Sequence, residues 1–264
     1  MQKFISMASF EWPNRIVPSG WLEHGPFAFW LMEQLKPRLT VELGTQRGYS
    51  FACFCQSVKK MKYPGRVICV DTWKGDEHAG IVDKMGDEMH ADLQAHVDEN
   101  YKGIGELKRT FFSEALNHVE DGTVNLLHVD GRHFYDDAKE DHTTWIRKLA
   151  PSAVVLFHDT QVRDHGFGVY KYWAEVSAGQ PSFEFEHGHG LGVLQYGKLH
   201  DGPLADMLSP SLPEVTRKDI RAMYSRLGVG INAHYEHQRY RRRFEERKNP
   251  LKKIAKELAR PFRK

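Results

Sequence analysis

Two pairs of polar residues, each placed directly after an apolar run, have the composition of a catalytic centre. Asp130 and His133 follow one run, and His158 and Asp159 follow the next one along the chain. A histidine can take a proton from a hydroxyl near neutral pH, and a carboxylate can orient the imidazole ring or hold a metal ion. These residue types predict acid–base chemistry, with or without a divalent metal.

A third group of residues predicts a nucleoside-binding site. Glu42, Gly44 and Gly48 form the pattern ExGxxxG at the end of an apolar run, and Asp71 ends the next run. A glycine turn lets backbone N–H groups approach a ligand closely, and the following acid can accept both ribose hydroxyls. A pyrophosphate would need GxGxxG. The pattern therefore favours a nucleoside without a pyrophosphate; the alternative is a turn that only connects two elements.

Apolar runs separated by helical periodicity predict how these groups meet. Strands are expected at 40–43, 66–70, 107–111, 124–129 and 153–157, with helices between them at 50–61, 89–100, 113–119 and 136–149. Such alternation is typical of a parallel sheet covered on both faces. Parallel strands end at one edge of a sheet, so both polar pairs should lie beside the glycine turn in one crevice.

The rest of the chain supplies an expected hairpin and a basic tail. A helix at 169–176 is followed by strands at 183–185 and 192–196, and their glycine-rich connection predicts an antiparallel hairpin that completes the sheet. We divide the chain into an N-terminal cap segment (1–37), a catalytic domain (38–200), and a linker with a basic helical tail (201–264).

Several motifs together resemble a known family. Glu42, Gly44, Gly48 and Asp71 are similar to motif I and the ribose-binding acid of class I S-adenosylmethionine-dependent methyltransferases. Over residues 38–197 the chain resembles the branch that includes cephalosporin-hydroxylase-like proteins and bacterial sugar O-methyltransferases, through the runs Asp71-Thr72-Trp73-Lys74-Gly75-Asp76, Asp130-Gly131-Arg132-His133, Phe157-His158-Asp159-Thr160 and His187-Gly188-His189-Gly190-Leu191-Gly192-Val193.

This resemblance implies a fold, a cofactor and an acceptor. The fold is an α/β, Rossmann-like, mostly parallel seven-stranded sheet that ends in an antiparallel hairpin, with helices on both faces. The cofactor is S-adenosyl-L-methionine, and the residues expected to hold it are Glu42, Gly44, Thr45, Gly48, Asp71, Thr72 and Trp73. The acceptor is a hydroxyl of a sugar or glycan in surface-polysaccharide or natural-product biosynthesis.

The resemblance also implies roles for the two polar pairs. In the metal-dependent branch the acid after the fourth strand and two acids after the fifth hold magnesium, so Asp130 and Asp159 become ligands and His133 the catalytic base. His158 stands where that branch has an acid. Magnesium prefers oxygen ligands, so a site of Asp130, His158 and Asp159 implies another metal or none. Without a metal, His133 or His158 would be the base and Asp159 would orient it.

Two other functions fit parts of the pattern. A metal-dependent oxygenase would use His133, His158 and Asp159 as two histidines and a carboxylate, but it leaves the cofactor pocket unexplained. A non-catalytic, methyltransferase-like module would be recruited through its basic tail, with His158 marking a decayed site.

Charge is distributed unevenly along the chain. Residues 239–264 carry 12 Lys and Arg against 3 Glu, a net charge of +9, whereas the preceding residues carry 25 bases and 32 acids, a net charge of −7. A basic amphipathic helix, expected at 251–259, can contact an anionic membrane surface or a glycosyltransferase. An acidic body argues against nucleic acid. We expect a cytoplasmic protein, with peripheral contact at the inner face of the membrane as an option.

Overall fold

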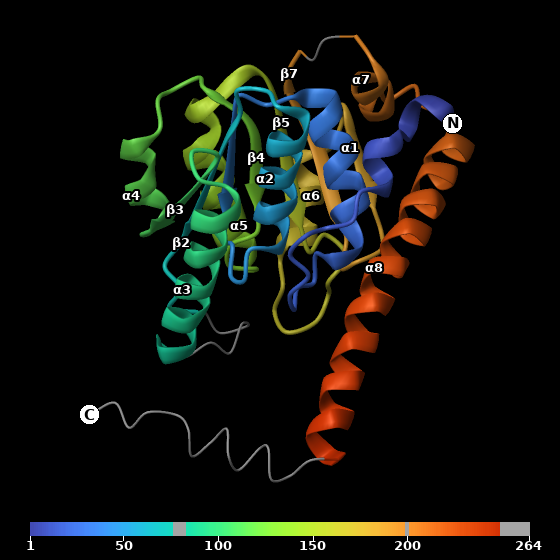
Figure 1. Ribbon diagram of the computed structural model, residues 1–264. Coiled ribbons are helices and arrows are strands. Elements are labelled where there is room, and N and C mark those ends of the chain that lie inside the picture. Colours follow the sequence, from blue (N-terminus) through green and yellow to red (C-terminus); the bar gives the residue numbers. More distant parts are fainter. Residues whose placement is uncertain (76–82, 199–200, 249–264) are drawn as a thin grey trace.

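A single mixed sheet organises the molecule. In residues 1–75, 83–198 and 201–248, which the computed structural model describes, seven strands have the order β3-β2-β1-β4-β5-β7-β6 (Figure 1). The first five are parallel, and β7 is antiparallel to both β5 and β6. The strands are β1 (Leu39–Leu43), β2 (Arg66–Asp71), β3 (Gly105–Arg109), β4 (Val124–Val129), β5 (Leu149–His158), β6 (Ser182–Phe185) and β7 (Leu191–Gly197). The predicted fold class is confirmed.

Helices cover both faces of this sheet, as the alternation of elements predicts. The buried apolar side chains form two clusters, one on each face of the sheet. One face carries α1 (Gly25–Leu35), α2 (Tyr49–Met61), α3 (Asp83–Asn100), α7 (Pro203–Leu208) and α8 (Glu214–Lys248). The other face carries α4 (Phe112–Ala115), α5 (Tyr135–Trp145) and α6 (Val169–Val176).

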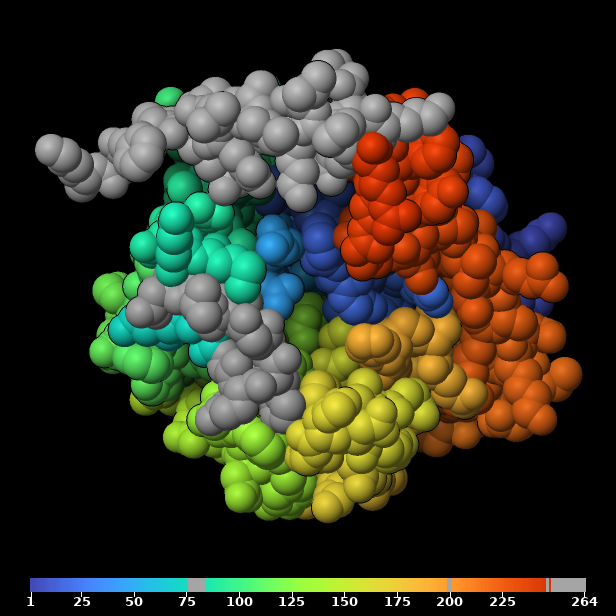
Figure 2. Space-filling model, turned by 90° about the horizontal axis from the view of Figure 1, so that it is seen from below, coloured from blue at the N-terminus to red at the C-terminus, as the bar shows by residue number. Residues whose placement is uncertain are grey.

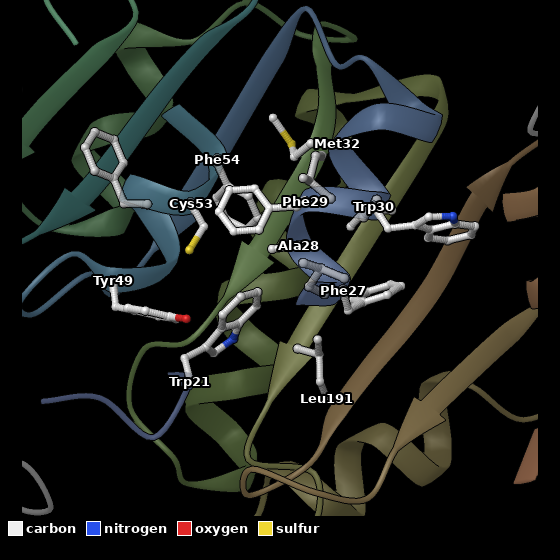
Figure 3. Packing of buried hydrophobic residues seen from close by; sticks show 14 of the residues in the cluster. Trp21, Phe27, Ala28, Phe29, Trp30, Met32, Tyr49, Cys53, Phe54 and Leu191 are labelled. Carbon is white, nitrogen blue, oxygen red and sulfur yellow. The ribbon is translucent and has the colours of Figure 1, made fainter. Parts of the chain in front are cut away.

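The N-terminal segment contributes much of the core. Figure 3 shows side chains of α1 and α2, with Trp21 of the preceding segment, gathered over the strands. Phe27, Trp30 and Leu31 are fully buried on different sides of α1, because this helix packs against α2 and α8 as well as the sheet. The Tyr224 hydroxyl of α8 also donates to the carbonyl of Phe4 (2.8 Å). The two outer segments therefore share one core with the sheet.

The C-terminal region contains more helix than the sequence indicates. Where a linker is expected after residue 200, α7 buries Leu204, Met207 and Leu208. The helix α8 is continuous from Glu214 to Lys248, through Gly228 and Gly230. The helix expected at 251–259 lies outside the described residues.

Gly228 has a packing role that Gly230 lacks. A Cβ at Gly228 would lie 2.1 Å from the carbonyl oxygen of Glu23, whereas nothing lies within 4 Å of a Cβ at Gly230. α8 can therefore lie directly against the 3-10 helix Leu22–His24 only because residue 228 has no side chain.

This difference gives a matched pair of substitutions. Alanine is about 1 kcal/mol better than glycine inside a helix, so Gly230→Ala should raise the free energy of unfolding by up to about that amount. Gly228→Ala should lower it by about 2 kcal/mol or more, because the helix must move off the Glu23 backbone. Urea unfolding of both variants measures the contrast. Equal effects at the two positions would contradict the packing role of Gly228.

Within the described part of the chain, no helix is both long and apolar enough to cross a membrane.

Candidate active site

A cleft of about 550 Å³ opens at the edge where the parallel strands end. Its walls come from the segments that follow β1, β2, β3, β4 and β5, and from residues 18–20 of the N-terminal segment. Figure 2 looks onto this edge of the molecule. Most predicted site residues line the cleft: Gly44, Thr45, Gly48, Asp71, Thr72, Trp73, Asp130, His133, His158 and Asp159. The sequence-based expectation of one shared crevice therefore agrees with the structure.

Two glycines form the turn after β1 because other residues would not fit. Gly44 has φ +87° and Gly48 has φ +76°, a left-handed conformation that side chains rarely adopt. A Cβ at Gly44 would lie 1.9 Å from the carbonyl oxygen of Asp130. The Gly44 N–H donates to Val70 (2.9 Å), and the Asp130 N–H donates to Leu43 (2.8 Å). The turn is thus held between the ends of β2 and β4.

Asp71 organises this turn through its carboxylate. Oδ2 accepts the backbone N–H groups of Thr45 (3.0 Å) and Gln46 (2.8 Å), and Oδ1 accepts that of Trp73 (2.7 Å). The Trp73 indole N–H donates in turn to the Gln46 carbonyl (2.8 Å). A carboxylate has about four acceptor positions, so roughly one remains for a ligand. Asp71 therefore shapes the loop and can also accept a ribose hydroxyl.

Glu42 lies beneath the turn and not in the cleft. Its side chain is fully buried, with Oε1 accepting from the Thr45 hydroxyl (2.8 Å) and Oε2 bonded to His128 Nδ1 (2.9 Å). Both oxygens are thus engaged by protein groups. This geometry contradicts the prediction that Glu42 contacts the cofactor directly. Glu42 instead positions Thr45, which does line the cleft.

Asp159 is the centre of the catalytic cluster. Oδ2 accepts from His133 Nε2 (3.1 Å) and lies 3.4 Å from His158 Nδ1, while Oδ1 lies 3.2 Å from His189 Nδ1. Burial alone would raise the pKa of this carboxyl, but the charge of His158 and the hydrogen bonds from His133, His158 and His189 hold it well below its usual value. Its φ of +62° is strained for a residue other than glycine. Such strain is typical of functional positions.

His158 carries a positive charge in this arrangement. Nδ1 faces Asp130 Oδ1 (3.1 Å), and Nε2 faces the carbonyl oxygen of Gly188 (3.1 Å). Both partners are acceptors, so both ring nitrogens must donate. Burial acts to lower the pKa of His158, but Asp159 and Asp130 raise it well above the usual value. His158 therefore has no free lone pair. This contradicts both of its predicted roles, as a metal ligand and as the alternative base.

His133 is the histidine that is arranged to take a proton. Its ring stacks on Phe167, with centroids 4.4 Å apart and planes 13° from parallel. With Asp159 accepting from Nε2–H, Nδ1 is the nitrogen that can receive a proton. The sequence-based choice of His133 as base is compatible with this geometry.

A metal ion would use a different ligand set from the one predicted. Asp130, His133 and Asp159 each offer a ligand atom, and these atoms lie within 4.8 Å of one another. Two carboxylates and an imidazole suit manganese, iron or zinc better than magnesium. The residues fit a divalent metal, with His133 in the place that we expect for His158.

Three parts of the cleft are not predicted from the sequence. His189, which lies in the glycine-rich connection of the expected hairpin, bonds to Asp159 although its side chain is 61% exposed. Residues 18–20 show no periodicity that would place them over the cleft. Asp141 lines the cleft from α5, and the only sequence signal for it is its spacing of four residues from Asp137 on the helix after His133.

The sheet order, the glycine turn and the cluster at the ends of β4 and β5 define the class I methyltransferase architecture. Residues 41–160 match the family model for a methyltransferase domain. The predicted resemblance to class I S-adenosylmethionine-dependent methyltransferases is confirmed.

Solved structures and one sequence relative are similar to this chain. A proposed caffeoyl-CoA O-methyltransferase from Staphylococcus aureus has the same fold, with a TM-score of 0.50 at 16% identity over 69% of this chain and 86% of that one. An O-methyltransferase from Bacillus cereus, solved with SAH, gives 0.49 at 13% identity over 70% and 84%. The uncharacterized protein y4gI of Sinorhizobium fredii is 51% identical over 192 residues, which is 73% of this chain and 20% of that protein. The chain thus spans about a fifth of this relative's length.

Proposed function

We propose that the chain is an S-adenosylmethionine-dependent O-methyltransferase. The observation that carries the proposal is the position of the His133–Asp159 pair (3.1 Å) in the same cleft as the Gly44 turn and Asp71. One end of this cleft can hold a nucleoside, and the other offers a base for a hydroxyl.

The residues of the cleft divide the reaction between them. Bound S-adenosylmethionine supplies an electrophilic methyl group on sulfur. The turn around Gly44 and the carboxylate of Asp71 would hold the nucleoside in the cleft that His133 also lines. His133 takes the hydroxyl proton while the acceptor oxygen forms a bond to the methyl carbon and the carbon–sulfur bond breaks. Asp159 orients the ring and stabilises its charge, and S-adenosylhomocysteine leaves.

The polar surroundings of His133 favour a hydroxyl-rich acceptor. Ser19, Asp130 and His189 line the same cleft as His133 and offer both donors and acceptors. Neighbouring hydroxyls of a sugar ring could be bound by groups of this kind. Together with the sequence resemblance, this supports a sugar or glycan acceptor from surface-polysaccharide or natural-product biosynthesis.

The geometry disfavours the oxygenase alternative. That chemistry needs a metal held by two histidines and a carboxylate, and the candidate histidines are His133 and His158. His158 donates from both ring nitrogens to Asp130 and Gly188, so it cannot act as a ligand without losing these bonds.

We also propose that α8 contacts an anionic membrane surface. Its end carries exposed basic side chains and extends beyond the domain (Figure 1): Arg239, Arg241, Arg242, Arg243 and Arg247. Such a charge cluster is attracted to anionic lipid and is screened by salt. Co-sedimentation with phosphatidylserine vesicles tests this; binding that equals that of neutral vesicles would exclude it.

Transfer of tritium from labelled S-adenosylmethionine to a panel of nucleotide sugars and glycans tests the proposed function. We expect label in at least one hydroxyl-bearing acceptor. Sinefungin should bind the protein, with heat detected by calorimetry. A protein that binds neither sinefungin nor S-adenosylhomocysteine at saturating concentration would not be a methyltransferase.

Chelation separates two versions of the mechanism. A divalent ion at Asp130, His133 and Asp159 would stabilise the acceptor alkoxide, but it would also occupy the imidazole that otherwise takes the proton. We expect transfer to persist within about twofold after chelator treatment, because His158 already contacts Asp130 and Asp159 and its positive charge offsets part of theirs. Loss of transfer that manganese or zinc restores would instead assign His133 as a ligand.

A further inference from the structure

The connection between β6 and β7, residues 186–190, holds the catalytic cluster from one side. Nδ1 of its His189 bonds to Asp159 Oδ1 (3.2 Å), and the carbonyl oxygen of its Gly188 faces His158 Nε2 (3.1 Å). Both contacts depend on where this short connection lies. A residue that fixes the connection would therefore act on the catalytic cluster without touching the substrate.

The backbone of this connection needs support from the rest of the fold. Gly188 (φ +56°), His189 (φ +69°) and Gly190 (φ +91°) are three consecutive residues in the left-handed region. Side chains rarely adopt this conformation, so His189 persists in it only where the surrounding structure holds it there. Within the connection, the Gly190 N–H donates to the His187 carbonyl (2.9 Å).

His24 supplies such support from the N-terminal segment. It is fully buried at the end of the 3-10 helix Leu22–His24, and its Nε2 lies 2.9 Å from the carbonyl oxygen of Gly188. Because a carbonyl oxygen only accepts hydrogen bonds, Nε2 must carry the hydrogen. A Cβ at Gly188 would lie 2.9 Å from the same nitrogen, so the contact requires glycine at that position.

The Gly188 carbonyl oxygen thus accepts from two imidazoles, those of His24 and His158. The two rings meet edge to face, with centroids 5.7 Å apart and planes at 85°. A carbonyl oxygen has two lone pairs and can accept both N–H groups. The bond from His24 therefore fixes the oxygen at the point where His158 binds it.

His24 is a neutral donor in this position. Burial, followed by the nearby His187 and His158, holds the pKa of His24 well below its usual value. Its Nδ1 has no hydrogen-bond partner within the described part of the chain. A cation here would repel the charged ring of His158. A neutral imidazole donates one hydrogen bond and avoids that repulsion.

We propose that His24 is a positioning residue for methyl transfer: it holds the Gly188 carbonyl oxygen in the place that His158 requires. His158 in turn contacts Asp159 (3.4 Å), the carboxylate that orients the base. The N-terminal segment is then part of the active site, although His24 itself does not line the cleft. This inference rests on the proposed function.

Substitutions of His24 test the role. His24→Phe keeps a ring but removes the donor, and it should lower the single-turnover rate by about 10- to 100-fold, the loss typical of displaced catalytic groups. The dissociation constant of S-adenosylhomocysteine should change by less than about threefold. His24→Gln retains an N–H donor and should restore the rate to within about fivefold of the wild type. The rate is measured with an acceptor that the tritium assay labels.

Two other variants make the result specific. His142 is a second buried histidine, on the opposite face of the sheet, where its Nδ1 bonds to the Tyr172 hydroxyl (2.7 Å). His142→Phe should therefore keep the rate within about twofold. Gly188→Ala places a methyl group against His24 Nε2 and should lower the rate as His24→Phe does. It decides the question if His24→Phe does not fold.

Amide hydrogen exchange, followed by NMR, tests the contact without an acceptor. The Gln161 N–H donates to the His189 carbonyl (2.8 Å), so the Gln161 and Gly190 amides report on the position of the connection. Both should exchange at least about tenfold faster in His24→Phe than in the wild type, and at the wild-type rate in His142→Phe.

The outcomes separate this inference from the proposed function. An unchanged rate in His24→Phe, or unchanged exchange of both amides, would overturn the positioning role. Equal losses of rate in His24→Phe and His24→Gln, or a parallel fall of rate and affinity, would assign His24 to general stability and also overturn it. If the wild-type protein binds neither sinefungin nor S-adenosylhomocysteine, the methyltransferase proposal itself fails.

Discussion

His133→Ala should lower the rate of methyl transfer by about 10²- to 10⁴-fold while changing the affinity for S-adenosylhomocysteine by less than about threefold. Positioned general bases contribute a factor of this size. Affinity should persist because His133 contacts Asp159 and Phe167 and not the glycine turn. Single-turnover transfer and calorimetry measure the two quantities separately.

Two additional variants show whether the lost group is a base. His118→Ala changes an exposed histidine outside the cleft and should leave both quantities unchanged. His133→Asn keeps a donor toward Asp159 but cannot take the proton, so it should be as slow as His133→Ala. A parallel fall of affinity and rate would assign His133 a structural role instead.

Asp71→Ala should lower both the affinity for S-adenosylhomocysteine and the free energy of unfolding. Its carboxylate accepts three backbone N–H groups, from Thr45, Gln46 and Trp73, and hydrogen bonds to charged groups contribute about 1.5–3 kcal/mol each without being additive. We expect the free energy of unfolding to fall by about 2–4 kcal/mol and the dissociation constant of S-adenosylhomocysteine to rise more than tenfold.

The comparison for Asp71 is Asp219→Ala, which removes an exposed acid of α8 and should be nearly silent. Urea unfolding and calorimetry give the two readouts. A loss of affinity with unchanged stability would mean that Asp71 acts on the ligand alone and that the three backbone contacts are weak.

The sequence predicts the parts of the molecule that depend on local pattern. The strand and helix positions follow from periodicity. The turn after β1 follows from its glycines, because only glycine fits such positions, as the close approach of Gly44 to the Asp130 carbonyl shows. The length of α8 does not follow from the sequence pattern. Glycine has a low helix propensity, and Gly228 lies inside this helix because it packs against the Glu23 backbone.

The roles of Glu42 and His158 depend on partners that sequence spacing does not reveal. Glu42 bonds to His128 on the neighbouring strand, and His158 lies between Asp130 and the carbonyl of Gly188 in the hairpin connection. A family resemblance shows which position should carry a functional residue. The hydrogen bonds of that residue depend on partners that only the fold brings together. The sequence does not predict Asp141 as a cleft residue for the same reason, because only the folded chain places it against Gly131 and Phe112.

The contacts of Tyr224 with Phe4 and of Gly228 with Glu23 have a practical consequence for engineering. The matched family segment, residues 41–160, cannot be excised as a minimal enzyme, since α1 and α8 would leave a large aromatic surface uncovered. A truncation that retains autonomous folding should keep both flanking segments, at least as far as Ile231, which is still buried. Fusion partners are better tolerated beyond that residue, where α8 is largely solvent-exposed.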